Sequence, residues 1–212
     1  MPYLRVAVLL AVAAAGAPSV MPSGPGDPLA SLRRTTGSIR VECNTALETV
    51  MLLVQLASPG PPLTDFQAEA RSRFSLHSNH AAVRETAALM EHGLTGQDLA
   101  RFSTFMASAP DFRLKDSKEL AQLAEMLPSG NVSFNMDRLA GYAKLVREFY
   151  WDLRVGQFFR DAAPRYRQAV GRKLPPDLPP GSRVLLSPLA PVARMEFVRR
   201  SPKPVTYLVL GG

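Results

Sequence analysis

Three histidines are the first residues in this sequence with the chemistry to bind a metal or move a proton. His77 and His80 stand three residues apart in an expected loop, and His92 lies twelve residues beyond His80. Twelve residues correspond to about 120° around a helix, so His80 and His92 would not share a face. No cysteine or carboxylate cluster completes a tetrahedral set of ligands. We therefore interpret the histidines as helix caps and surface residues; a metal site at His77 and His80 with an unknown partner is the weaker hypothesis.

Carboxylates and the single cysteine add little catalytic chemistry. Glu148 and Asp152 lie four residues apart on one expected helix and could form a catalytic pair, but a solvated polar face is the simpler interpretation. Cys43 has no second cysteine for a disulfide and no histidine placed beside it, which favours a small buried hydrophobic residue over a catalytic thiol. The sequence has no glycine-rich phosphate loop, no G-x-S-x-G motif and no H-E-x-x-H motif. The residues alone therefore reveal no active site.

The composition is that of a folded domain in which clusters of proline mark the connecting segments. The 212 residues are 46% hydrophobic and 20% charged, enough for one domain with a real core. The 19 prolines cluster near the N-terminus, at residues 59–62 and over residues 175–204. The net charge is +7, yet the basic residues are scattered among acidic ones and form no long run. Nucleic-acid binding is therefore not expected.

The first 17 residues have the three-part form of a secretory signal peptide. Arg5 precedes an apolar run over residues 6–17, which is too short to span a bilayer of about 30 Å. A buried N-terminal helix is the alternative interpretation. We expect residues 18–37 to form a flexible lead-in. The protein is accordingly expected to be exported, periplasmic or extracellular, and to meet a membrane only through the signal peptide.

Hydrophobic periodicity predicts helices through most of the chain. Over residues 137–172, apolar and aromatic residues recur at steps of three and four, which indicates two tandem amphipathic helices with a bend at Gly156. A helix over residues 45–57 is apolar nearly all round and should be central; Thr45 and Glu48 form a capping-box pattern at its start. A weak alternation over residues 38–43 indicates one short strand. Further helices are expected to follow cap residues: Thr64, Asn79, Thr95, and Asp116 or Ser117.

The chain changes character after Arg172. Four prolines between Leu174 and Gly181 exclude a helix, and three short β-rich runs follow, over residues 183–187, 195–199 and 205–210. We interpret them as strands of an antiparallel sheet. The predicted fold class is mainly α, with about seven helices packed round a central buried helix. The helical domain would span residues 38–173, and a Pro-rich linker with a small, incomplete C-terminal antiparallel sheet would span residues 174–212.

Several motifs, defined by apolar and aromatic spacing and not by catalytic residues, occur in order along the chain and carry a family resemblance. The motifs are residues 47–57, 74–83 with 94–99, 145–150 with 158–161 and Tyr166, and 184–189 with 207–211. Their order and spacing resemble a bacterial family known only as domain-of-unknown-function family 4932. The resemblance covers roughly residues 38–212.

The resemblance implies a relative of the gluzincin zinc metallopeptidases. In such proteins an H-E-x-x-H helix follows the strand that matches residues 205–210; its zinc would activate a water molecule and its glutamate would act as base. These 212 residues contain no such motif, so the resemblance assigns no catalytic or metal-binding residue, and zinc is expected only with a downstream motif. The sheet edge in such enzymes can bind an extended substrate by strand addition. We assign that edge to Val205, Thr206, Tyr207 and Leu208.

Two hypotheses of function follow. The first is the N-terminal portion of an exported zinc-metallopeptidase-like protein that would not hydrolyse peptides by itself. The second is a non-enzymatic exported helical module that binds a protein or the cell envelope. A zinc motif downstream would favour the first and exclude the second. Under both hypotheses the expected partner is a peptide or a protein.

Overall fold

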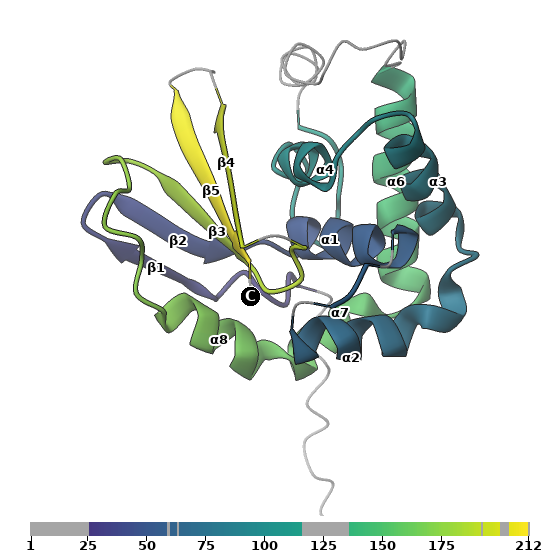
Figure 1. The fold of residues 1–212 in the computed structure, drawn as a ribbon, viewed down its shortest axis with the longest axis horizontal. Helices are drawn as coiled ribbons and strands as arrows, with labels where there is room; N and C mark the ends of the chain where they lie inside the picture. Colours follow the sequence, from purple (N-terminus) through teal and green to yellow (C-terminus); the bar gives the residue numbers. More distant parts are fainter. Residues whose placement is uncertain are drawn as a thin grey trace, which may run out of the picture.

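The computed structural model describes residues 26–58, 60–62, 64–115, 136–191, 193–199 and 204–211. Within these ranges a β-sheet occupies one side of the molecule and most of the helices the other (Figure 1). None of the described helices is both long enough and apolar enough to cross a membrane. The predicted signal peptide and the helix expected after Asp116 lie outside the described residues.

The described residues form five strands and seven α-helices. The strands are β1 (Arg33–Thr36), β2 (Ile39–Cys43), β3 (Arg183–Ser187), β4 (Arg194–Arg199) and β5 (Val205–Gly211). The helices are α1 (Thr45–Ala57), α2 (Asp65–Phe74), α3 (Ala81–Glu91), α4 (Gly96–Ser103), α6 (Met136–Asp152), α7 (Val155–Asp161) and α8 (Ala163–Gly171), with a short 3-10 helix, η1 (Ser75–His77), after α2.

All five strands belong to one mixed sheet in the order β1-β2-β3-β5-β4. Strands β2, β3 and β5 are parallel, and β1 and β4 are antiparallel to their neighbours. The predicted fold class, mainly α with a small antiparallel C-terminal sheet, is therefore wrong, because the fold is mixed α/β. Strand β2, which precedes the helices, pairs with β3, which follows them. A parallel pair needs a long crossover, and here the crossover is the helical segment itself.

Helix α1 is the buried centre of the helical part. Every residue from Thr45 to Gln55 is buried, and the helix packs against α2, α3, α4, α6 and β3. The N-cap is Asn44, whose side chain accepts a hydrogen bond from the Leu47 N–H at 3.0 Å. The expected capping box is not formed, because Thr45 already lies inside the helix and Glu48 is directed into the core.

The predicted tandem helices appear as three. Their aromatic stripe is buried as expected, including Tyr142, Phe149, Phe158 and Tyr166. The chain bends at Arg154, which has a left-handed backbone with φ of 51°, two residues before the predicted bend. Gly156 instead sits inside α7 where a Cβ would overlap the hydroxyl of Tyr150. A second break near Ala162 separates α7 from α8, which packs against β2 and β3.

Candidate functional site

Strand β4 forms one outer edge of the described sheet, beside β5. The carbonyl of Ala193 accepts a hydrogen bond from the Gly211 N–H at 2.9 Å, so the odd-numbered residues of this segment direct their backbone groups toward β5. Because the direction alternates along a strand, the backbone groups of Arg194, Glu196 and Val198 face away from the sheet. These groups are where an extended peptide could add as a further strand.

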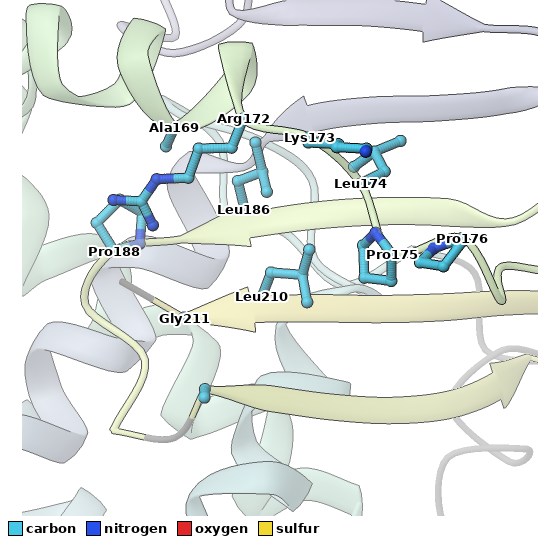
Figure 2. Close-up of a pocket in the computed structure, with 11 residues that line it drawn as sticks. Ala169, Arg172, Lys173, Leu174, Pro175, Pro176, Leu186, Pro188, Leu210 and Gly211 are labelled. Atoms are coloured by element: carbon cyan, nitrogen blue, oxygen red, sulfur yellow. The ribbon is translucent and has the colours of Figure 1, made fainter.

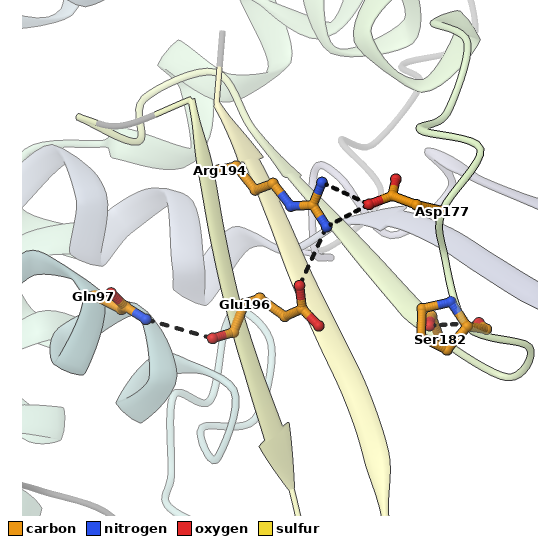
Figure 3. Close-up of polar contacts among 6 residues, drawn as sticks. Gln97, Asp177, Ser182, Arg194 and Glu196 are labelled. Carbon is orange, nitrogen blue, oxygen red and sulfur yellow. Dashed lines mark hydrogen bonds and ion pairs between the residues drawn. The ribbon is translucent and has the colours of Figure 1, made fainter.

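One of these outward groups already accepts a hydrogen bond from outside the sheet. The side-chain amide of Gln97, on α4, lies 3.5 Å from the carbonyl oxygen of Glu196 (Figure 3). Gln97 is held in the first turn of α4 by a capping box between Thr95 and Asp98. Val198, two residues beyond Glu196, is 42% exposed and offers an apolar contact beside the edge.

The strand predicted to be the substrate edge is an inner strand. Tyr207 and Leu208 pair with β3 on one side and with β4 on the other, and Val205 and Thr206 pair with β4. A peptide could not add to β5 there, because β4 already occupies its outer side. Strand β5 is the last strand in the sequence, but β4 is the outermost strand in the sheet. The candidate edge therefore lies one strand further out.

A row of rings and guanidinium groups fixes β4 in place. The rings of Phe197 and Tyr207 stack with centroids 5.4 Å apart and planes 3° apart. The guanidinium of Arg101, on α4, lies 5.4 Å from the Phe197 centroid, and that of Arg183 lies 5.9 Å from the Tyr207 centroid. Such stacked cation–π contacts favour one arrangement of the strands over others. The edge is accordingly presented by a well-packed strand.

The opposite face of β4 is tied to the Pro-rich segment before β3. Arg194 lies 3.2 Å from the Glu196 carboxylate and 3.3 Å from that of Asp177 (Figure 3). These contacts, first with Glu196 and then with Asp177, raise the pKa of Arg194, which therefore stays charged. The contacts are exposed to solvent, so they position the strand more than they stabilise it.

His80 has a structural role. Its Nδ1 accepts a hydrogen bond from the Ala82 N–H at 3.1 Å and thereby caps α3, while its Nε2 lies 3.5 Å from the Asp152 carboxylate. Since Nδ1 accepts, the proton is on Nε2, and both nitrogens are occupied. His77 lies in η1, and His92 contacts a backbone carbonyl. Nowhere in the described ranges do three or more His, Cys, Asp or Glu side chains group in a way that could hold a metal ion.

The remaining candidates also have structural partners. Glu148 pairs with Lys144 at 3.8 Å, and Asp152 faces His80, so the two carboxylates do not work as a pair. Cys43 is buried, and burial raises the pKa of its thiol well above the usual value. A thiol that resists ionisation is a poor nucleophile. The interpretation of Cys43 as a small buried residue therefore agrees with its position.

Sequence reasoning missed a buried carboxyl group in α1. Glu48 is fully buried, and its Oε2 accepts a hydrogen bond from the hydroxyl of Tyr166 at 2.7 Å. Its other oxygen, Oε1, has no hydrogen-bond partner among the described residues. Burial raises the pKa of Glu48 to about 7, against the opposing effects of Ser187, of the Tyr166 hydroxyl and of the Leu189 backbone. Thr45 and Glu48 match the sequence pattern of a capping box, so the sequence indicates that Glu48 is a capping residue at the helix start and does not predict its burial.

A cavity of about 540 Å³ lies at the carboxyl ends of β3 and β5 (Figure 2). Leu186 and Leu210, which are paired across the two strands, form its apolar floor, and Pro175 is in its wall. Figure 2 shows the Arg172 side chain extending toward Pro188 at the rim. The described lining residues include no carboxylate, hydroxyl, thiol or imidazole. The cavity could bind a ligand, but it offers no acid–base or nucleophilic pair.

Comparison of this chain with protein-family models, curated proteins and solved structures found no match. The resemblance to family 4932 thus stays a prediction that rests on apolar and aromatic spacing.

Proposed function

We propose that this chain is the N-terminal portion of an exported zinc-metallopeptidase-like protein, and that its part there is to bind an extended peptide along the outer edge of β4. The observation that carries the proposal is the outward-facing backbone of Arg194, Glu196 and Val198 on a strand that packs against β5. A peptide lying along β4 would exchange main-chain hydrogen bonds with Arg194 and Val198, and it would compete with the Gln97 side chain for the carbonyl of Glu196. Main-chain pairing supplies affinity with little dependence on sequence.

The other outer strand is a poorer site for strand addition. The carbonyl of Leu32 accepts a hydrogen bond from the Cys43 N–H at 3.0 Å, so Arg33 and Thr35 are the residues of β1 that face outward. All four residues of β1 are polar, and two are arginines. Charged and polar edges discourage pairing with another chain. Strand β4 also has two arginines and a glutamate, but half of its residues are apolar: Met195, Phe197 and the exposed Val198.

No hydrolytic step is assigned to this chain. Across the described ranges the residues do not fit a zinc ion, since no suitable group of His, Cys, Asp or Glu exists there. The sequence as a whole has no H-E-x-x-H motif. Peptide would therefore bind without being cleaved by these residues. Chelator-sensitive peptide cleavage by the purified chain would contradict this part of the proposal.

Hydrogen exchange tests the position of the peptide. Unstructured peptides of mixed sequence are added to the purified chain, and backbone amide exchange is followed by mass spectrometry. The outward amides of β4 exchange with solvent in the free protein and should slow when a peptide pairs with them. Slowing confined to β4 supports the proposal. Slowing confined to β1, or none in either edge strand at saturating peptide, would contradict it.

A further inference from the structure

A second cavity, of about 260 Å³, opens on the face of the sheet opposite Leu186 and Leu210. Its floor comes from side chains that strand pairing brings together. Arg40 on β2 is opposite Arg183 on β3, which is opposite Tyr207 on β5. Arg33 on β1 joins them in the lining, and Lys115 contributes from the loop after α4. The β1–β2 hairpin, β3, β5 and the loop after α4 thus converge on one polar cavity.

The charges around this cavity do not balance. Four cationic side chains line it, against the two carboxylates of Asp27 and Glu42. Glu42 is taken by Arg40, with Oε2 2.7 Å from Nε. Arg183 has the Tyr207 hydroxyl, at 3.4 Å, as its hydrogen-bond partner, and no carboxylate in the described part of the chain pairs with Arg33 or Arg183. The guanidinium groups of Arg33 and Arg183 therefore have no carboxylate partner among the described residues.

The remaining acidic group, Asp27, lies beside the start of helix α1. The Asp27 carboxylate accepts a hydrogen bond from the Leu29 N–H at 2.9 Å and another from the Thr45 hydroxyl, so it is already bound by the protein. Asn44, the N-cap of the 13-residue helix α1, also lines the cavity. The positive end of the α1 dipole therefore lies at the cavity wall, where it offsets part of the negative charge of Asp27.

We propose that this cavity binds a compact, multiply charged oxyanion of the phosphate class. Guanidinium groups form forked hydrogen bonds that match phosphate oxygens, and Arg33 and Arg183 are the ones with no competing carboxylate. The volume is smaller than the range of roughly 300–1,000 Å³ common for drug-sized ligands, which favours a phosphate group over a nucleotide. This site is on the sheet face, and its existence does not depend on peptide binding at β4.

Calorimetry with the purified chain tests the proposal, using inorganic phosphate as the probe at constant ionic strength. Saturable binding is expected, and Arg183→Gln or Arg33→Gln should each weaken it about ten-fold, the usual effect of losing one charged hydrogen bond. Arg84→Gln is the matched control, because it removes the same charge from an exposed position on α3. Glu42→Gln should tighten binding, since it releases Arg40 from its carboxylate.

The outcomes separate a specific site from general charge attraction. Absence of saturable binding, or equal weakening in all three arginine variants, would overturn the proposal. Circular dichroism checks folding; if Arg183→Gln does not fold, Arg33→Gln, at an exposed position on β1, decides the matter. Glycerol phosphate distinguishes the source of the anion: binding as tight as that of inorganic phosphate indicates a phosphate ester, and much weaker binding indicates the free ion.

Discussion

The hydroxyl of Tyr166 donates a hydrogen bond of 2.7 Å to the carboxyl group of Glu48 in the interior of the protein. The two residues are 118 positions apart in the sequence, and both are fully buried. The bond joins α8, which lies against the sheet, to α1, the centre of the helical part. Burial raises the pKa of both groups, that of Glu48 to about 7. The junction between sheet and helices thus contains a group that titrates near neutral pH.

Stability should fall as the pH rises from about 4.5 to about 7. The unfolded chain has the ordinary glutamate pKa of 4.5, so between these values the folded state keeps a proton that the unfolded state has lost. The stabilising effect of that proton is complete below pH 4.5 and is lost as pH rises through 7, a change of about 3 kcal/mol. Urea unfolding of the wild type and Glu48→Gln over this range measures it. Parallel pH profiles for the two proteins would contradict the assignment.

Tyr166→Phe should destabilise the protein more at pH 8 than at pH 5. The hydroxyl favours the ionised carboxylate, as Ser187 and the Leu189 backbone also do, and the substitution removes the 2.7 Å hydrogen bond among these contributions. A hydrogen bond to a charged group contributes about 1.5–3 kcal/mol, and one to a neutral group less. Urea unfolding at the two pH values gives the difference. An equal loss at both would mean that Glu48 does not change its protonation in this range.

Gly156→Ala should destabilise the protein by about 1–3 kcal/mol, because the new Cβ would overlap the Tyr150 hydroxyl in a packed region. Gly141→Ala, in α6, is the matched control. Nothing lies within 4 Å of a Cβ built at Gly141, so alanine there should stabilise the helix by about 0.5–1 kcal/mol. Thermal unfolding of both variants measures the opposite signs. A Gly156→Ala protein as stable as the wild type would mean that Tyr150 moves aside freely.

The double variant His77→Ala and His80→Ala should leave the amount of bound zinc unchanged and lower stability by about 1 kcal/mol, the usual cost of a lost N-cap. His80→Asn restores a capping side chain and should recover most of that stability. Elemental analysis after dialysis against zinc, together with urea unfolding, checks both results. A drop in bound zinc would revive the metal hypothesis for these histidines.

Local features were predictable where one physical signal dominates. The unbroken apolar run over residues 50–54 requires burial, and α1 is buried. The aromatic spacing around Tyr142 and Phe149 required an inward stripe, which is present. The weak alternation ending at Cys43 corresponds to β2. Each of these predictions needed only the residues of one element.

Features that depend on a partner were not predictable. Alternation in a strand identifies its two faces but not its neighbour, so the parallel pairing of Val41 with Val184 left no signal in either segment. For the same reason the sequence did not indicate that β4 lies outside β5 in the sheet, and the peptide edge was assigned to the inner strand β5. Glu48 and Thr45 matched a capping pattern, but Asn44 lies one residue earlier and takes the cap. His80 likewise takes the cap expected of Asn79.

Replacing one outward backbone N–H on each outer strand tests the central proposal most directly. Val198→Pro removes an outward donor from β4, and Thr35→Pro removes one from β1; by strand alternation, neither position donates its N–H to a neighbouring strand. Binding of fluorescent unstructured peptides is measured by anisotropy for both variants and the wild type. We predict that Val198→Pro weakens binding at least about ten-fold, as expected for loss of a main-chain bond and for steric hindrance, while Thr35→Pro binds like the wild type. Unchanged binding by a folded Val198→Pro protein, or a loss caused only by Thr35→Pro, would contradict a peptide site at the edge of β4.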